Sequence, residues 1–140
     1  MRTLTRMLGA VALSAVMAQG AAATAQALPP ISSNAHIMQR LLAAAIGDAI
    51  RDNCPSIEER TWTVRTEALK LYNHARGLGY DHATIDGFLR DRAERAAVYA
   101  QRDAWLTANG VVAGDAESYC RAGRAEIEKR SLTGILLRVR

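Results

Sequence analysis

Three histidines, His36, His74 and His82, are the side chains of this sequence best suited to holding a metal ion. Zinc and copper need several imidazole or carboxylate groups that converge on one point. His74 and His82 flank a turn, and Asp86 follows His82 by one helical turn, so these three residues are the candidates for a small metal or ligand carrier. The sequence has no His-x-x-x-His or Glu-x-x-His pair, and exposed histidines are also common at helix ends. We therefore predict no resident metal or cofactor.

The two cysteines, Cys54 and Cys120, could be redox-active, metal-binding or structural. No Cys-x-x-Cys or Cys-x-x-Cys-His motif is present, which argues against thiol exchange and against covalent haem attachment. An even pair of cysteines in a small exported domain is most simply one disulfide. We therefore predict a structural Cys54–Cys120 bond.

The remaining polar residues do not form a recognisable catalytic set. There is no Gly-x-Ser-x-Gly motif, and the phosphate-loop and dinucleotide fingerprints are absent from the sequence. The serines mostly occupy positions typical of helix caps, and acidic pairs such as Glu58-Glu59 are typical of the first turn of a helix. The sequence therefore favours a non-enzymatic protein.

The C-terminal segment combines large aliphatic residues with arginines and lacks acidic neighbours. Its candidate partner-binding residues are Ile135, Leu136, Leu137, Arg138 and Arg140. One alternative is that this segment packs as a last turn of the core. The other is an exposed apolar and basic tail that docks on a partner protein or makes peripheral contact with an anionic membrane.

The N-terminus has the features of a cleavable export signal. Arg2 and Arg6 precede the apolar stretch Met7–Met17, and an alanine-rich segment ends in Ala25-Gln26-Ala27. Small residues in that pattern are what signal peptidase accepts. We therefore expect residues 1–27 to be removed, residues 28–140 to form a single helical domain, and the mature protein to lie in the periplasm.

The length and charge of the chain limit the kinds of partner that it can bind. A chain of 140 residues with 18 basic and 14 acidic side chains has a net charge of +4, and part of that charge belongs to the leader. Nucleic-acid binding needs a concentrated basic face, so we predict no nucleic-acid partner.

Hydrophobic spacing predicts the first two helices. Apolar residues recur at intervals of three and four from Ile37 to Ile50, and Cys54-Pro55 ends that helix. Ser56 and Glu59 then have the spacing of a capping box, which predicts a second helix from Ile57 to Gly77.

The second half of the chain predicts further helices. Asp81 caps a stretch that either continues to Asn109-Gly110 or breaks near Asp91, where Glu94 offers a second capping pair. A small-residue face in this stretch would let a neighbouring helix approach closely. That face comprises Ala93, Ala96, Ala97, Ala100, Ala104 and Ala108. Another helix is predicted from Ala116 to about Arg130, with a short closing segment at 132–139. No stretch of the sequence alternates apolar and polar residues as a strand does. The predicted fold is therefore all-α, a small antiparallel bundle of four to five helices.

Three motifs together resemble a known family. They are Asp52-Asn53-Cys54-Pro55, the run from Gly110 to Cys120 that ends Asp-Ala-Glu-Ser-Tyr-Cys, and the close at Ser131–Arg138. The chain resembles a domain-of-unknown-function family of small exported alphaproteobacterial helical proteins with one cysteine pair. The resemblance implies no assigned activity. Some relatives are encoded among genes for the respiratory NADH dehydrogenase, which implies an envelope accessory role.

Three functional hypotheses follow from the sequence. The leading one is a non-enzymatic periplasmic binding or accessory protein that associates with another envelope protein, such as a component of a respiratory or other envelope complex. The second is a disulfide-stapled periplasmic stress chaperone that loosens in acid. The third is the small metal or ligand carrier built on the histidines.

Overall fold

A computed structural model describes residues 26–140, so the predicted leader lies almost entirely outside the described residues. Five α-helices and two short strands form the fold, together with two 3₁₀ turns, η1 and η2. In chain order the elements are η1 (Ile31–Ser33), α1 (Ala35–Asn53), β1 (Ile57–Glu59), α2 (Thr61–Gly77), α3 (His82–Arg90), α4 (Arg92–Ala108), α5 (Ala116–Lys129), η2 (Gly134–Leu136) and β2 (Leu137–Val139).

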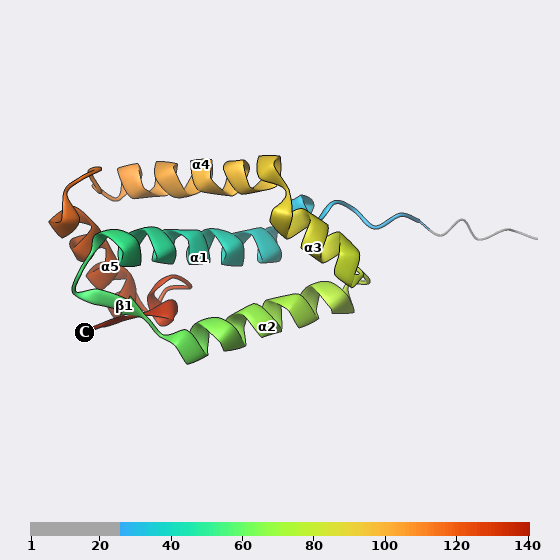
Figure 1. Cartoon of the computed structure of the whole chain (residues 1–140), viewed down its shortest axis with the longest axis horizontal. Coiled ribbons are helices and arrows are strands. Elements are labelled where there is room, and N and C mark those ends of the chain that lie inside the picture. The colour runs from blue at the N-terminus through green and yellow to red at the C-terminus, as the bar shows by residue number, and fades with distance from the viewer. Residues whose placement is uncertain (1–25) are drawn as a thin grey trace, which may run out of the picture.

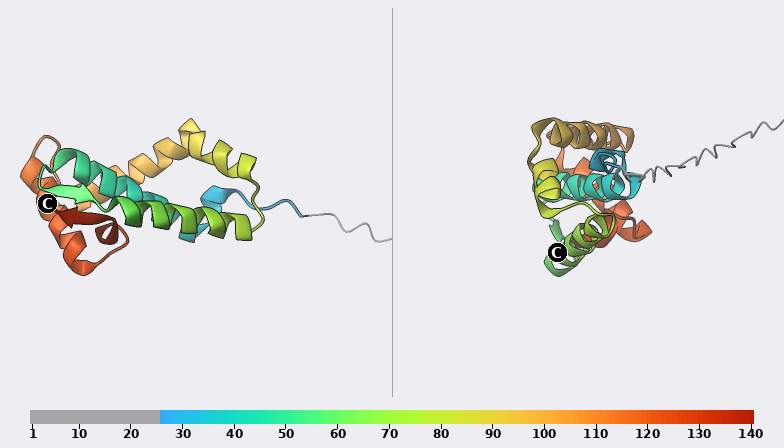
Figure 2. Two further views of the ribbon diagram at one scale, coloured as in Figure 1. Left: turned by 60° about the horizontal axis from the view of Figure 1, so that its bottom comes forward. Right: turned by 90° about the vertical axis from the view of Figure 1, so that its right-hand side faces the viewer.

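The longest helix, α1, lies in the middle of the molecule, with α4 along one side and α2 along the other (Figure 1). Helices α1 and α4 run in the same direction, α2 runs back against them, and α3 connects α2 to α4. Figure 2 shows α5 and the C-terminal segment gathered at the end of the molecule where α1 finishes. The prediction of a helical bundle of four to five helices is confirmed.

Side-chain caps begin four of the five helices, and the predicted caps at Asp81 and Asp91 are among them. Asn34 caps α1, Asp81 caps α3 and Asp115 caps α5 through hydrogen bonds from backbone N–H groups in the first turn. The Asp91 carboxylate accepts a 2.9 Å bond from the backbone N–H of Glu94. The stretch from residue 82 to residue 108 is therefore two helices that meet at Asp91.

Two strands are present where the sequence predicts none. Ile57–Glu59 pairs antiparallel with Leu137–Val139, with Ile57 opposite Val139. The predicted capping box is consequently wrong: Glu59 belongs to a strand, and α2 begins only at Thr61, after Arg60, whose side chain caps nothing. The pairing joins segments about eighty residues apart, which a search of local windows cannot detect.

The main core surrounds this strand pair and the end of α1. Its buried side chains are Ile46, Ile50, Cys54, Ile57, Cys120 and Leu137. A second cluster lies toward α3 and consists of Ile31, Ile37, Ala75, Tyr80 and Ile85. A third, smaller one joins Leu106, Val111 and Ala122.

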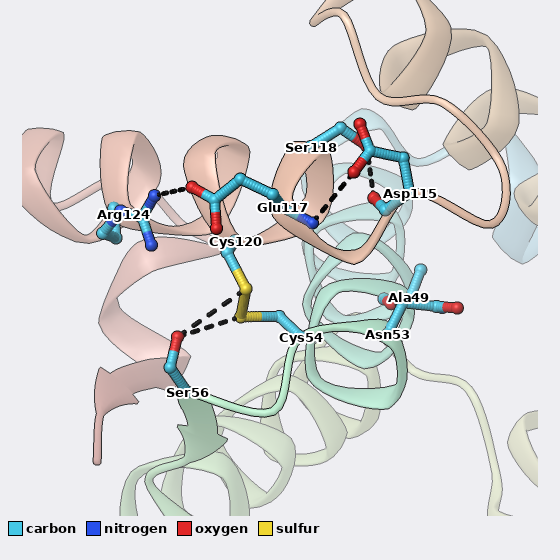
Figure 3. The surroundings of a disulfide bond; sticks show 9 residues. All are labelled: Ala49, Asn53, Cys54, Ser56, Asp115, Glu117, Ser118, Cys120 and Arg124. Carbon is cyan, nitrogen blue, oxygen red and sulfur yellow. Dashed lines mark hydrogen bonds and ion pairs between the residues drawn. A yellow bond between two sulfur atoms is a disulfide. The ribbon is translucent and has the colours of Figure 1, made fainter.

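The predicted disulfide is confirmed, and it lies inside the main core. Cys54 at the end of α1 is bonded to Cys120 in α5, with 5.1 Å between their Cα atoms. The Ser56 hydroxyl lies 3.3 Å from the Cys54 sulfur and 3.6 Å from that of Cys120 (Figure 3). Ser56 thus borders the disulfide instead of capping a helix.

Two glycines allow α5 to approach its neighbours closely. A Cβ atom on Gly123 would lie 2.5 Å from the Ile57 side chain and 2.7 Å from that of Ile50. A Cβ on Gly134 would lie 1.8 Å from the backbone oxygen of Glu126. Any larger residue at these positions would push α5 or the C-terminal segment out of place.

Candidate functional site

The C-terminal segment packs into the fold and is not an exposed tail. The Leu137 side chain is 1% exposed, within the main core. Arg138 and Arg140 both form ion pairs with the Glu58 carboxylate on the neighbouring strand. Of the five predicted partner-binding residues, only two contribute to a concave surface: Ile135 and Leu136 line a groove next to α2.

This apolar groove, the α1–α2 groove, lies between α1, α2 and the segment that leads into β2. It holds about 120 Å³ of open space. Its walls are formed by Leu41, Ala43, Ala44, Val64, Ala68, Leu71, Leu132, Ile135 and Leu136, with Arg40 and Glu67 beside them. Such a hollow, walled almost entirely by aliphatic side chains, can accept a bulky apolar group but offers few hydrogen bonds.

One ion pair crosses from α1 to α2 beside the groove. The Arg40 guanidinium donates to the Glu67 carboxylate at 2.7 Å, and Lys70 donates to the same carboxylate at 2.8 Å. The hydrogen bond from Lys70, followed by the attraction of both cations, lowers the pKa of Glu67. Because the Glu67 side chain is only 19% exposed, this pair also fixes the position of α2 relative to α1.

The opposite face of α2 points to solvent and carries large apolar side chains. Trp62 is 80% exposed and Leu69 is 60% exposed. They share one row with Arg65, Asn73 and Arg76, spaced three, four, four and three residues apart and all exposed. We call this row the outer face of α2. Hydrophobic spacing alone does not reveal that these two large apolar side chains lie in solvent.

The three histidines do not meet at one point. The ring of His74 contacts that of His36, with 4.5 Å between ring centres, and not that of His82. His82 lies 3.3 Å from the Tyr72 hydroxyl, while Asp86 is paired with Arg90. Among residues 26–140, no three histidine, cysteine, aspartate or glutamate side chains are grouped closely enough to hold a metal ion.

A polar cleft of about 300 Å³ lies between α1, α4 and the start of α5. At its edge the Arg51 guanidinium binds three carboxylates: Asp48 at 3.1 Å, Asp52 at 2.9 Å and Glu59 at 2.8 Å. Burial raises the pKa of Asp48, and repulsion from Asp52 and Glu59 adds to that rise while Arg51 opposes it. One guanidinium thus joins three carboxylates and balances one of their three negative charges, an arrangement typical of a structural ion-pair cluster.

The alanine-rich face predicted to receive a neighbouring helix is exposed instead. All six of its alanines, from Ala93 to Ala108, are accessible to solvent, and α4 packs on α1 through Val98, Trp105 and Leu106. Alanine has the highest helix propensity, so a run of alanines can stabilise a helix without marking its buried side.

The fold defines a small five-helix protein with one buried disulfide and an apolar groove between α1 and α2. The chain belongs to a family of unknown function (DUF5333), whose family model matches residues 29–138. No curated protein and no solved structure matches it. The disulfide is consistent with an oxidising compartment. Within residues 26–140, none of the helices has the length and hydrophobicity required to cross a bilayer.

Proposed function

We propose that this protein is an exported, non-enzymatic binding protein of the periplasm that associates with another envelope protein. The α1–α2 groove is its binding site. The occupant is a short apolar segment of the partner, for instance of a subunit of a respiratory or other envelope complex. The observation that carries this proposal is the groove itself, whose apolar walls are contributed by three separate segments of the chain.

The size and lining of the groove indicate the chemistry of the occupant. A space of about 120 Å³ is comparable with one or two large aliphatic or aromatic side chains. The charged groups beside it, Arg40 and Glu67, are bound to each other and therefore select neither a cation nor an anion. An uncharged, apolar segment is the occupant that buries surface here without leaving a charge unpaired.

The charge of the C-terminal arginines supports this assignment of the site. Arg138 and Arg140 are held by Glu58 on the far side of the strand pair, so they do not border the groove. Partner binding through this segment would therefore depend on Ile135 and Leu136, and not on the arginines.

Filling the groove tests the proposal. Ala68 lies on its wall and is itself exposed, so Ala68→Phe places a ring in the hollow without disturbing the core. The matched control is Ala96→Phe on the exposed face of α4. A photo-crosslinking amino acid is placed at Thr63, next to the groove-lining Val64, and cross-linking is carried out in intact cells that export the protein.

We expect wild type and Ala96→Phe to cross-link to one envelope protein through the same short apolar peptide, identified by mass spectrometry. Ala68→Phe should abolish that product while leaving the circular-dichroism spectrum and the melting temperature unchanged. Equal cross-linking by Ala68→Phe, or cross-links scattered over unrelated proteins, would contradict the proposal.

One observation favours a stress chaperone as the second candidate. The contact between His36 and His74 helps to join α1 to α2, and His36 already accepts a hydrogen bond from the Arg40 side chain at 3.2 Å. Only Ala75 of α2 is buried, so few other contacts hold this helix in place. In this reading acid loosens α2 and exposes the apolar walls of the groove.

Dye binding distinguishes the two candidates. If the chaperone function holds, binding of an apolar fluorescent dye rises as the pH falls from 7 to 3, and the rise is larger in His74→Gln, which lacks the ring contact with His36. A flat profile down to pH 3, with no suppression of client aggregation, removes this candidate and leaves the first one intact.

A further inference from the structure

We propose that the outer face of α2 docks this protein on an anionic phospholipid surface. This site is separate from the α1–α2 groove, which lies on the opposite side of the same helix. It is also separate from the C-terminal segment, whose arginines are already paired.

The composition of this face suits the boundary between water and lipid. Trp62 and Leu69 are the two most exposed large apolar side chains among residues 26–140. They stand about two turns apart on one row of a 17-residue helix. Tryptophan is favoured where water meets hydrocarbon, because its ring is apolar while its N–H group can remain hydrated. An exposed tryptophan and leucine on one row of a helix are therefore suited to the boundary of a bilayer.

The charge of this face complements an anionic surface. Arg65 lies between Trp62 and Leu69, and Arg76 lies about two turns beyond Leu69. Neither arginine forms an ion pair with a carboxylate within the described part of the chain. The Arg65 guanidinium lies 5.8 Å from the centre of the Trp62 ring, so cation and indole are presented together. The one acidic residue of α2, Glu67, is turned to the inner side and held by Arg40 and Lys70. The row itself therefore carries no negative charge, and the exposed Asp81 carboxylate at the start of α3 is a negative group that Arg76 attracts.

The position of α2 also suits a lipid surface. Helix α2 lies along one edge of the molecule (Figure 1). The side chains of its outer face do not line the α1–α2 groove, whose other walls come from α1 and from the segment that contains η2. A bilayer interface can accept a helix face of arginine, tryptophan and leucine anywhere on its surface, whereas a protein partner would need a matching acidic surface. The observations therefore favour lipid headgroups over a protein surface.

The test uses protein isolated from the envelope of the cell that exports it, so that its N-terminus is the one the cell leaves. Binding is measured by co-sedimentation with two kinds of vesicle: phosphatidylcholine alone, and phosphatidylcholine with 30% phosphatidylglycerol. Brominated lipids report which tryptophan enters the interface, because the chain has two, Trp62 and Trp105, and Trp62→Phe removes the exposed one.

We expect binding to the phosphatidylglycerol vesicles only, lost at high salt. Each arginine near the surface contributes about fivefold to partitioning, so Arg65→Gln with Arg76→Gln should weaken it by about 25-fold. The matched control, Arg92→Gln with Arg95→Gln on α4, should leave it unchanged. Quenching by brominated lipid should be strong in wild type and nearly absent in Trp62→Phe.

The inference is overturned if wild type binds both kinds of vesicle equally or binds neither. It is also overturned if the α4 control weakens binding as much as the α2 double variant. Ala68→Phe separates this result from the proposed function, since filling the groove should stop cross-linking to a protein partner yet leave vesicle binding unchanged.

Discussion

The regions on the two sides of α1 differ in how many apolar side chains they bury. Toward its C-terminal end, the strand pair, α5 and the disulfide enclose Ile50 and Ile57 completely, with 0% of either side chain exposed. Along its other flank, α2 runs for 17 residues and buries only Ala75. We refer to these regions as the stapled core and the α2 arm.

This difference indicates a division of roles. Burial of apolar surface is the main source of stability, so the stapled core holds the fold together. The α2 arm keeps its position through Ala75 in the second cluster, an ion pair and a histidine contact, and it leaves large apolar side chains in solvent. A helix packed in this way opens at lower cost than the core and can offer its surface to a partner.

Removing the disulfide should have the largest effect on the stapled core. Cys54 and Cys120 are 66 residues apart, and closing a loop of that length stabilises a fold by about 4 kcal/mol in the chain-entropy model. We expect the Cys54→Ala, Cys120→Ala protein to lose about that much unfolding free energy in a urea titration. A loss below about 1 kcal/mol would show that the core does not depend on the bond.

Truncating one aliphatic side chain in each region tests the difference directly. Ile50→Ala empties a fully enclosed site and should cost about 3 kcal/mol. Leu71→Ala removes a half-exposed side chain of the α2 arm and should cost about 1 kcal/mol. Chemical denaturation of both variants measures the two values, and equal losses would contradict the division.

Two glycine-to-alanine substitutions should change the unfolding free energy in opposite directions. Gly123→Ala forces a methyl group against Ile50 and Ile57, which should cost about 1–2 kcal/mol even after the gain in helix propensity. Gly87→Ala in α3 meets no atom within 4 Å and should stabilise the protein by about 0.5 kcal/mol. Thermal melting of both variants gives the comparison. If Gly123→Ala also stabilises, the core is less tightly packed than the structure shows.

The smallest effect concerns the ion pair of the α2 arm. Because the pKa of Glu67 is lowered in the folded protein, its ionised form contributes stability above the ordinary carboxyl range. That contribution is lost as the pH falls through the lowered pKa. Glu67→Gln should therefore lose roughly 0.5 kcal/mol at pH 7. The difference from wild type should shrink toward pH 3.

Asp86→Asn is the control for this measurement, since it removes an exposed pair with Arg90 inside α3. It should change the unfolding free energy very little at either pH. A larger loss of unfolding free energy from Asp86→Asn than from Glu67→Gln would mean that the ion pair between α1 and α2 stabilises the fold no more than an exposed pair within one helix.

Local sequence signals predicted the helices well. Asp81 and Asp91 each form the expected cap, since a cap depends only on residues within one turn. The disulfide was also predictable, because the chain offers only one intramolecular pairing.

The strand pair and the site could not be predicted in this way. Three residues are too few to show an alternating pattern, and the partner of Ile57–Glu59 lies at the other end of the chain. The α1–α2 groove likewise joins three segments distant in sequence, so Ile135 and Leu136 could be singled out but their neighbours on α2 could not. Exposure of Trp62 was missed because hydrophobicity alone does not say which face of a helix is covered.

The difference between the stapled core and the α2 arm is tested most directly by native-state hydrogen exchange. Mass spectrometry resolves the exchange into peptides of α1, α2 and α5. We predict that amides of α2 exchange by local openings that cost several kcal/mol less than global unfolding. Amides in the C-terminal half of α1 and in α5 should exchange only with global unfolding. Equal protection of α2 and α5 would contradict the account, because the α2 arm would then be as firmly held as the stapled core.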